Sequence, residues 1–173
     1  MNQMTASSGA DGRHGTGQPE RRILFVCTGN TCRSPMAEVL LRDMAEKRGL
    51  ADAVEVMSAG IYPVAGDPAT AGAIAAVKTL KGIDLRGHSA RLLDARQLRE
   101  ATVVLAMTQR HVESIRDAFP DLAERVYTLK AYAGHDVRDT DISDPYGTSD
   151  ENYLACAREI LAALERAEEK LLG

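Results

Sequence analysis

Residues 23–35 read ILFVCTGNTCRSP, and this stretch decides how the rest of the chain is arranged. The apolar run ILFVC is typical of a strand that is buried on both faces, and it stops at Cys27. Small and polar residues follow, and Pro35 suits the first turn of a helix. The stretch therefore predicts a thiol at the carboxyl end of a buried strand, next to a loop that leads into a helix.

Outward from this stretch, strand patterns and helix patterns alternate along the chain. Apolar runs predict strands at residues 22–27, 53–60, 102–108 and 125–130. Amphipathic patterns predict helices at residues 34–49, 67–82, 94–101, 109–119 and 149–172. Asp67 is expected to cap the second helix, with Pro68 at its first position. Strands separated by helices indicate a single α/β domain with a four-stranded parallel sheet and helices on both faces.

Composition excludes several classes of protein. A chain of 173 residues with 45% hydrophobic and 27% charged residues is typical of one globular domain. The net charge of −4 gives no attraction to nucleic acid or to an anionic membrane, and no apolar run reaches the length of a membrane span. Residues 1–20, rich in Gly, Ser and Thr, are expected to form a disordered tail before a domain at 21–173. Three cysteines favour a reducing cytoplasm over a disulfide framework.

The loop after Cys27 has the composition of an oxyanion site. Ligands of parallel sheets bind beyond the carboxyl ends of the strands, where backbone N–H groups at the start of a helix attract anions. Gly29 and Asn30 tolerate the backbone angles of such a nest, and the fork of Arg33 suits two phosphate oxygens. Ser34 can cap the helix or hydrogen-bond the cysteine. Besides Cys27 and Arg33, the predicted phosphate-binding loop comprises Thr28, Gly29, Asn30, Thr31, Cys32 and Ser34.

Cys27 is the predicted nucleophile. A helix N-terminus and a neighbouring cation both favour the thiolate, which attacks a bound phosphoryl group while Arg33 stabilises the transition state. A metal site is not expected, because Cys27 and Cys32 lack the spacing and the further ligands of a zinc site.

The leaving group also needs a proton donor, and the sequence DISDPYG supplies a candidate. Asp144 is favoured over its acidic neighbours Asp136, Asp139 and Asp141, because Pro145 stiffens its backbone. Tyr146 offers an aromatic wall beside the substrate. Ile61 and Tyr62 are expected either to form the other wall or to pack in the ordinary way. For His88 and His111, surface or capping roles are favoured.

With these motifs in place, residues 22–172 resemble the low-molecular-weight protein tyrosine phosphatase family. VCTGNTCRSPMAE is similar to its phosphate loop, SAG to its second strand end and DPYG to its acid loop. The resemblance implies a two-step mechanism without a cofactor, acting on phosphorylated proteins and releasing inorganic phosphate. Cys27 would take the phosphoryl group, and Asp144 would protonate the leaving atom and then activate water.

One residue points to a branch of the family. Most relatives carry a bulky aliphatic residue before the second loop cysteine, whereas this chain has Thr31. The loop CTGNTCRS resembles the bacterial protein-arginine phosphatases, in which the threonine helps to select phosphoarginine and the acid-loop aspartate also contacts the guanidinium. A protein-tyrosine phosphatase is the alternative, with Thr31 then a neutral substitution.

Three other readings concern the cysteines. Under oxidation Cys32 can form a protective disulfide with Cys27, as the family implies, or it can be a small packing residue. An arsenate reductase of the thiol-relay type would need two further cysteines near the site, and only Cys156 remains, in a helical core pattern. A nonenzymatic thiol sensor or phosphopeptide-binding module would not require Asp144.

Overall fold

The computed structural model describes residues 18–173, so residues 1–17 of the predicted tail lie outside the described part. Its elements alternate as the sequence predicts. The four strands are β1 (Arg21–Cys27), β2 (Val54–Gly60), β3 (Val103–Ala106) and β4 (Val126–Thr128). The helices are α1 (Arg33–Lys47), α2 (Ala71–Lys81), α3 (Ala95–Glu100), α4 (Gln109–Ala118), η1 (Pro120–Arg125), α5 (Leu129–Tyr132) and α6 (Asp150–Leu172).

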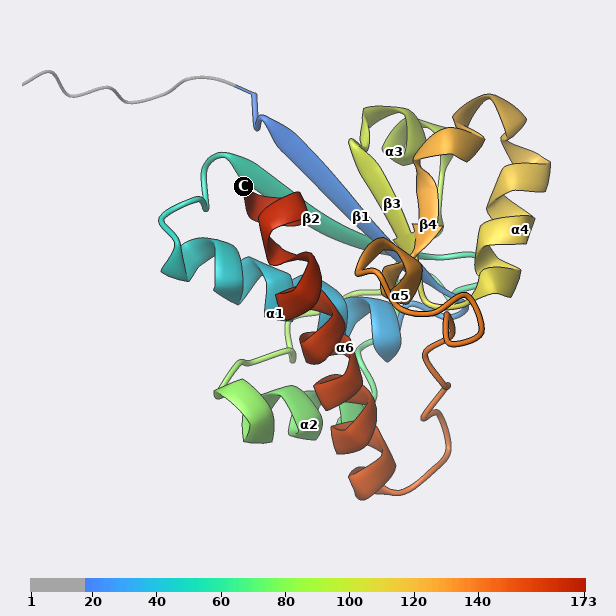
Figure 1. Ribbon diagram of the computed structural model, residues 1–173. Helices are drawn as coiled ribbons and strands as arrows, with labels where there is room; N and C mark the ends of the chain where they lie inside the picture. The colour runs from blue at the N-terminus through green and yellow to red at the C-terminus, as the bar shows by residue number, and fades with distance from the viewer. Residues whose placement is uncertain (1–17) are drawn as a thin grey trace, which may run out of the picture.

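The strands form one parallel sheet in the order β2-β1-β3-β4, which confirms the predicted fold class (Figure 1). β1 pairs with β2 on one side and with β3 on the other. Because the chain leaves β1 toward β2 first and returns later to its other side, the strand order reverses at β1. Such a switch point opens a crevice at the carboxyl ends of the two central strands. Cys27 is the last residue of β1 and lies at this crevice.

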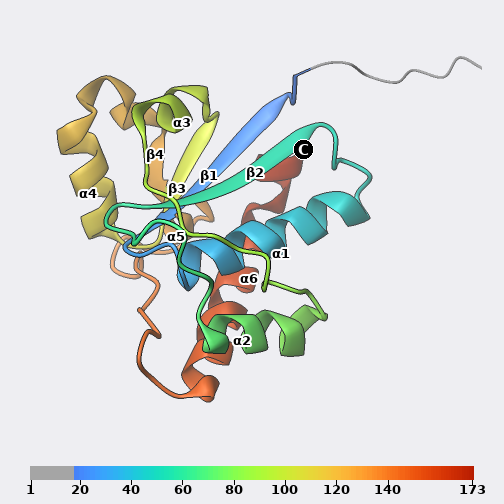
Figure 2. The same cartoon turned by 180° about the vertical axis from the view of Figure 1, so that it is seen from behind.

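Alternate residues of β1 face two separate hydrophobic cores. Ile23 and Phe25 pack with α1, α2 and α6 on one face, whereas Leu24 and Val26 pack with α3 and α4 on the other (Figures 1 and 2). Both faces of the strand are therefore buried, which explains why its sequence is continuously apolar. None of the helices within residues 18–173 combines the length and the apolar character that crossing a membrane requires.

The second helix begins later than the sequence predicts. α2 starts at Ala71 and is capped by Thr70, whose hydroxyl accepts a hydrogen bond from the N–H of Ala73 at 3.3 Å. The prediction that Asp67 caps this helix and Pro68 opens it is therefore wrong. The backbone of Asp67 belongs to the preceding loop, where its carbonyl accepts a hydrogen bond from Ala90 at 2.8 Å.

The fourth strand is shorter than predicted. β4 ends at Thr128, because the hydroxyl of Thr128 accepts a hydrogen bond from the N–H of Ala131 and caps the short helix α5. Leu129 and Lys130, predicted to extend the strand, are the first residues of this helix. The turn places the Lys130 side chain beside the loop that carries Asp144, which becomes important below.

Candidate active site

The loop between β1 and α1 is held in the shape of an anion nest. Asn30 has a φ of 54°, the only positive φ of a non-glycine residue within 18–173. Gly60, at the end of β2, lies against this loop, and a Cβ at that position would be 2.7 Å from the carbonyl oxygen of Thr28. A side chain at position 60 would thus displace the loop. The glycine of the SAG sequence permits this close approach.

A chain of hydrogen bonds fixes the loop from inside. The side-chain amide of Asn30 donates to the hydroxyls of Ser34 and Ser58, each at 2.9 Å. Ser58 donates in turn to the carboxylate of Glu38, which is also bound by Arg42. All four groups from Asn30 to Glu38 are buried, so their hydrogen bonds are shielded from competing water.

Ser34 faces the predicted nucleophile, Cys27. Of the two roles that the sequence allowed, the structure shows the second: the Ser34 hydroxyl lies 2.9 Å from the Cys27 sulfur, whereas helix α1 begins at Arg33 without a side-chain cap. The hydroxyl accepts a hydrogen bond from the Asn30 amide, and it also lies 3.4 Å from the carbonyl of Ala59, to which it can donate. The short contact with the Cys27 sulfur ties the position of that sulfur to the buried network behind the loop.

Arg33 and Asp144 meet across the site. The buried guanidinium of Arg33 donates to a carboxylate oxygen of Asp144 at 2.8 Å and to the carbonyl of Ile142 at 3.1 Å. Its Nε is buried and has no hydrogen-bond partner within residues 18–173. Arg33 therefore retains a donor for an oxyanion held in the loop, which fits the donor set expected for phosphate.

These residues line a cavity of about 260 Å³. Its wall contains Cys27, Thr28, Gly29, Thr31, Cys32, Arg33, Tyr62, Val64, Asp67, Asp144 and Tyr146. Tyr62 and Tyr146 are both strongly exposed, so the mouth of the cavity has two aromatic side chains. The structure thus brings the predicted nucleophile, arginine and acid into one pocket with Thr31, and it leaves Asn30 and Ser34 behind the loop as supports.

The other acidic residues of the 134–148 loop have different partners. Asp136 pairs with Arg138, Asp139 pairs with Lys130, and the Asp141 carboxylate accepts a hydrogen bond from the N–H of Gln109. Of the four aspartates considered as the acid, only Asp144 lines the cavity. The choice made from the Asp-Pro pair agrees with this geometry.

Two histidines support the phosphate loop in a way that the sequence did not predict. His111 is buried, not at the surface, and its ring nitrogens are hydrogen-bonded to the hydroxyls of Thr28 at 2.8 Å and Thr108 at 2.9 Å. Burial, and secondarily the charge of Arg33, lower the pKa of His111 to about 4, so the ring is neutral at pH 7. His88 lies 2.6 Å from the carbonyl of Asn30. The only sequence signal for the role of His111 was Thr108, three residues earlier at the start of a predicted helix.

The remaining cysteines differ in their surroundings. Cys32, in the same loop as Cys27, is buried and contacts the hydroxyls of Thr70 and Tyr153. Cys156 lies in α6, where its thiol donates to the carbonyl of Ser143 at 3.7 Å, and burial raises its pKa to about 12. A thiol that resists ionisation is a poor relay nucleophile, which argues against the arsenate reductase reading.

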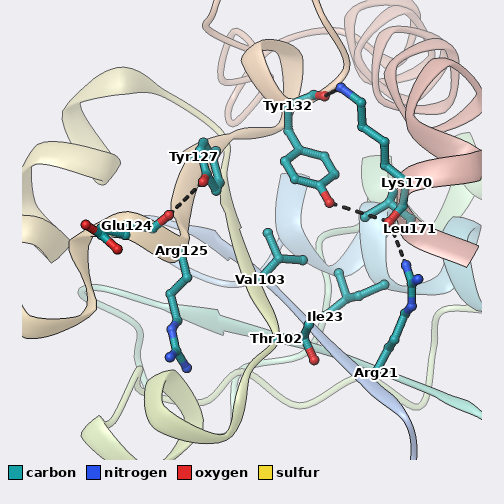
Figure 3. A pocket seen from close by; sticks show the side chains of 10 residues that line it. All are labelled: Arg21, Ile23, Thr102, Val103, Glu124, Arg125, Tyr127, Tyr132, Lys170 and Leu171. Carbon is teal, nitrogen blue, oxygen red and sulfur yellow. Dashed lines mark hydrogen bonds between the residues drawn. The ribbon is translucent and has the colours of Figure 1, made fainter.

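A second cavity, of about 230 Å³, lies at the amino-terminal ends of β1 and β3 (Figure 3). It contains three cationic side chains, and each donates to carbonyls at the end of a helix. Arg21 binds the carbonyl of Lys170 in α6, Lys170 binds that of Tyr132 in α5, and Arg125 binds those of Arg99 and Ala101 at the end of α3. Cations are favoured at these positions, so their presence has a structural explanation.

Comparisons with known proteins agree with the geometry of the first cavity. A model of the family described as low molecular weight phosphotyrosine protein phosphatase matches residues 22–172. The protein-arginine-phosphatase of Geobacillus stearothermophilus is 42% identical over 150 residues, covering 87% of this chain and 95% of that protein. The low molecular weight protein-tyrosine-phosphatase Etp of Escherichia coli K12 is 34% identical over 148 residues, covering 86% and 90%.

Solved structures give the same result. The low molecular weight protein tyrosine phosphatase from T. tengcongensis has 38% sequence identity and a TM-score of 0.81, covering 87% of this chain and 99% of that one. Fold and site define a cysteine-dependent protein phosphatase. The chain belongs to the low molecular weight phosphotyrosine protein phosphatase family, as its motifs predict.

Proposed function

We propose that the protein removes phosphate from phosphoarginine in other proteins. The observation that carries this proposal is Thr31, a small side chain with a hydroxyl, in the wall of the cavity. Two comparisons support it: the relative from Geobacillus stearothermophilus is named a protein-arginine-phosphatase, and its identity of 42% exceeds the 34% of the tyrosine phosphatase Etp.

In the first step the Cys27 thiolate attacks phosphorus and the bond from phosphorus to the guanidino nitrogen breaks. The phosphoryl oxygens are held by the backbone N–H groups of residues 28–33 and by the Arg33 guanidinium, which stabilises the charge of the transition state. The departing nitrogen takes the bonding electron pair and a proton from Asp144. In the second step Asp144 accepts a proton from water, which displaces the Cys27 sulfur and releases inorganic phosphate.

The mouth of the cavity suits a flat, cationic group. A guanidinium stacks on aromatic faces, and Tyr62 and Tyr146 provide two at the rim. Thr31 adds a small side chain with a hydroxyl, which leaves room for the N–H groups of the guanidinium and offers them an acceptor. Phosphotyrosine has the opposite requirement, because its ring gains from an apolar wall.

A protein-tyrosine phosphatase is the second candidate, favoured by the same aromatic rim, since two tyrosines can also enclose a phenyl ring. A side-by-side assay separates the two functions. We expect the kcat/KM for a phosphoarginine peptide to exceed that for a phosphotyrosine peptide of the same sequence context. A preference for phosphotyrosine would overturn the proposal, and Cys27→Ser serves as the inactive blank.

Substitution of Thr31 tests the structural basis of the preference. Thr31→Ile should lower the ratio of kcat/KM for phosphoarginine over phosphotyrosine about ten- to a hundredfold, because each N–H donor left unpaired costs roughly 1–3 kcal/mol. Thr31→Val keeps the shape and removes only the hydroxyl, so it reports the hydrogen bond alone. Thr31→Ser keeps the hydroxyl and is the matched control. An unchanged ratio in all three variants would exclude Thr31 as the selector.

We place this activity in the cytoplasm. Support comes from the three cysteines within residues 18–173, all of which are free thiols, as a reducing compartment would keep them. For oxidising conditions we propose that Cys32, which lines the same cavity, resolves an oxidised Cys27 as a disulfide and so protects the nucleophile from irreversible oxidation.

A further inference from the structure

The cavity contains a second carboxylate that the proposed mechanism does not use. Asp67 lines the same wall as Cys27 and Asp144 but comes from a different loop, the one between β2 and α2. Asp144 is paired with Arg33, whereas the Asp67 side chain forms no hydrogen bond or salt bridge within residues 18–173. Asp67 is exposed and Arg33 is buried, so the negative charge lies at the mouth and the positive charge at the floor.

The backbone around Asp67 is well anchored. The N–H of Gly66 donates to the carbonyl of Ala90 at 2.9 Å, and the N–H of Ala90 donates back to the carbonyl of Asp67 at 2.8 Å. The N–H of Thr70 donates to the carbonyl of Thr31 at 2.9 Å, which ties this loop directly to the phosphate loop. Pro68 restricts the backbone of Asp67 further. The backbone of Asp67 is therefore fixed relative to Thr31, and its side chain starts from a defined place at the cavity wall.

We propose that Asp67 is a specificity-determining residue that binds the guanidinium of phosphoarginine at the mouth of the cavity. The inference rests on the proposed function. Phosphoarginine is dipolar, with an anionic phosphoryl group next to a cationic guanidinium, and the cavity has the matching order of charges from Arg33 to Asp67. Phosphotyrosine has no cation to place there, and its phosphate dianion must pass the Asp67 carboxylate on entry. One carboxylate thus attracts the first substrate and repels the second.

The kinetic signature of this role differs from that of a catalytic group. The guanidinium keeps its positive charge in the bound substrate and in the departing product, so Asp67 stabilises the ground state and the transition state alike. Loss of such uniform binding raises KM and leaves kcat unchanged. Because the carboxylate is exposed, the expected loss in kcat/KM is moderate, about three- to tenfold.

The experiment compares Asp67→Asn with wild type on phosphoarginine and phosphotyrosine peptides. For phosphoarginine we expect KM to rise about three- to tenfold at constant kcat. For phosphotyrosine we expect kcat/KM to stay constant or increase. Asp67→Glu should restore part of the preference. Asp52→Asn is the matched control: it makes the same change in net charge at an exposed residue just before β2, at the other end of the sheet, and should leave both substrates unaffected.

Salt gives a second test, since exposed charges are screened over about 10 Å at 0.1 M ionic strength. The preference of wild type for phosphoarginine should fall with added salt more steeply than that of Asp67→Asn. If wild type prefers phosphoarginine and Asp67→Asn keeps the same ratio of kcat/KM values, the role of Asp67 is excluded while the proposed function stands. If wild type does not act on phosphoarginine, the proposed function and this inference both fail.

Discussion

In the proposed mechanism Asp144 first donates a proton to the leaving nitrogen and then accepts one from water. In the structure its carboxylate is bound to the Arg33 guanidinium at 2.8 Å. The dianionic phosphoryl group of a substrate competes for the same guanidinium. We therefore expect substrate binding to release Asp144 from Arg33, so that its side chain can turn toward the leaving nitrogen.

We expect Asp144→Asn to retain a hydrogen-bond acceptor for Arg33 but to lose the transferable proton. The rate with phosphoarginine should fall by roughly 10²–10⁴, the usual contribution of general acid catalysis. With p-nitrophenyl phosphate, whose leaving group needs little protonation, the loss in the rate of phosphocysteine formation should be much smaller. Pre-steady-state rates on both substrates make the comparison. An equal loss on both would mean that Asp144 has a structural role instead.

At the scale of elements, the loop at residues 134–148 must carry Asp144 to the phosphate loop although it contains no helix or strand. Lys130 of α5 anchors this loop. Its ammonium group is buried and binds Asp139, the carbonyl of Asp141 and Glu159 of α6. Burial acts to lower the pKa of Lys130, but the hydrogen bonds and charges of Asp139 and Glu159 outweigh it and raise the pKa, so the lysine remains a cation.

Lys130→Met should release the loop and leave Asp139 and Glu159 without their cation. We expect about a ten- to hundredfold loss of kcat on phosphoarginine, since small displacements of a catalytic group have effects of that size. The loss should be smaller on p-nitrophenyl phosphate, because the misplaced group is the acid. Arg138→Gln, which removes an exposed ion pair of the same loop, is the control and should be near neutral. A loss independent of the leaving group would indicate a general folding defect.

At the scale of the whole molecule, His111 couples the folding of α4 to the phosphate loop and makes stability depend on pH. The folded-state pKa is about 4, below the usual 6.5, because burial disfavours the charged ring. As pH falls below 6.5, the unfolded chain takes up a proton at this histidine before the folded protein does. This histidine therefore does not reduce the free energy of unfolding above pH 6.5, and it reduces it progressively as the pH falls from 6.5 toward 4.

Urea denaturation at pH 7 and at pH 4.5 measures this effect. His111 should contribute a decrease of about 1–3 kcal/mol in the free energy of unfolding between these pH values, allowing for partial solvent screening. In His111→Gln this part of the pH dependence should disappear, even if the variant is less stable at pH 7. If the free energy of unfolding changes equally between the two pH values in wild type and in His111→Gln, His111 is excluded as the source of this pH dependence.

Much of this architecture can be predicted from local sequence. The apolar run before Cys27 and the alternation of strands and helices predict the sheet, and CTGNTCRSP predicts the anion nest. These features are predictable because the signals for strand, loop and helix are carried by residues close together in the sequence. Asp67 misled the prediction because Asp-Pro is also the signature of a helix start. Its position in the cavity follows from hydrogen bonds to Ala90, far along the chain.

Contacts between distant residues explain the other omissions. The roles of Lys130 and His111 depend on partners such as Glu159 and Thr28, which lie 29 and 83 positions away. No periodicity or local motif in a single sequence encodes such pairs. Leu129 and Lys130 were predicted to continue the strand, but Thr128, the last residue of β4, also caps α5, so the chain turns into that helix instead.

The pairing of β1 on both sides has a consequence for how the enzyme moves. Residues 23–26 of β1 pair with a strand on each side, so we expect their amide protons to be exposed only when most of the domain opens. The proposed nucleophile, Cys27, directly follows these residues, whereas the proposed acid, Asp144, lies in the irregular segment 134–148. We therefore expect local movements of that segment to admit substrate and water without displacing the sulfur of Cys27.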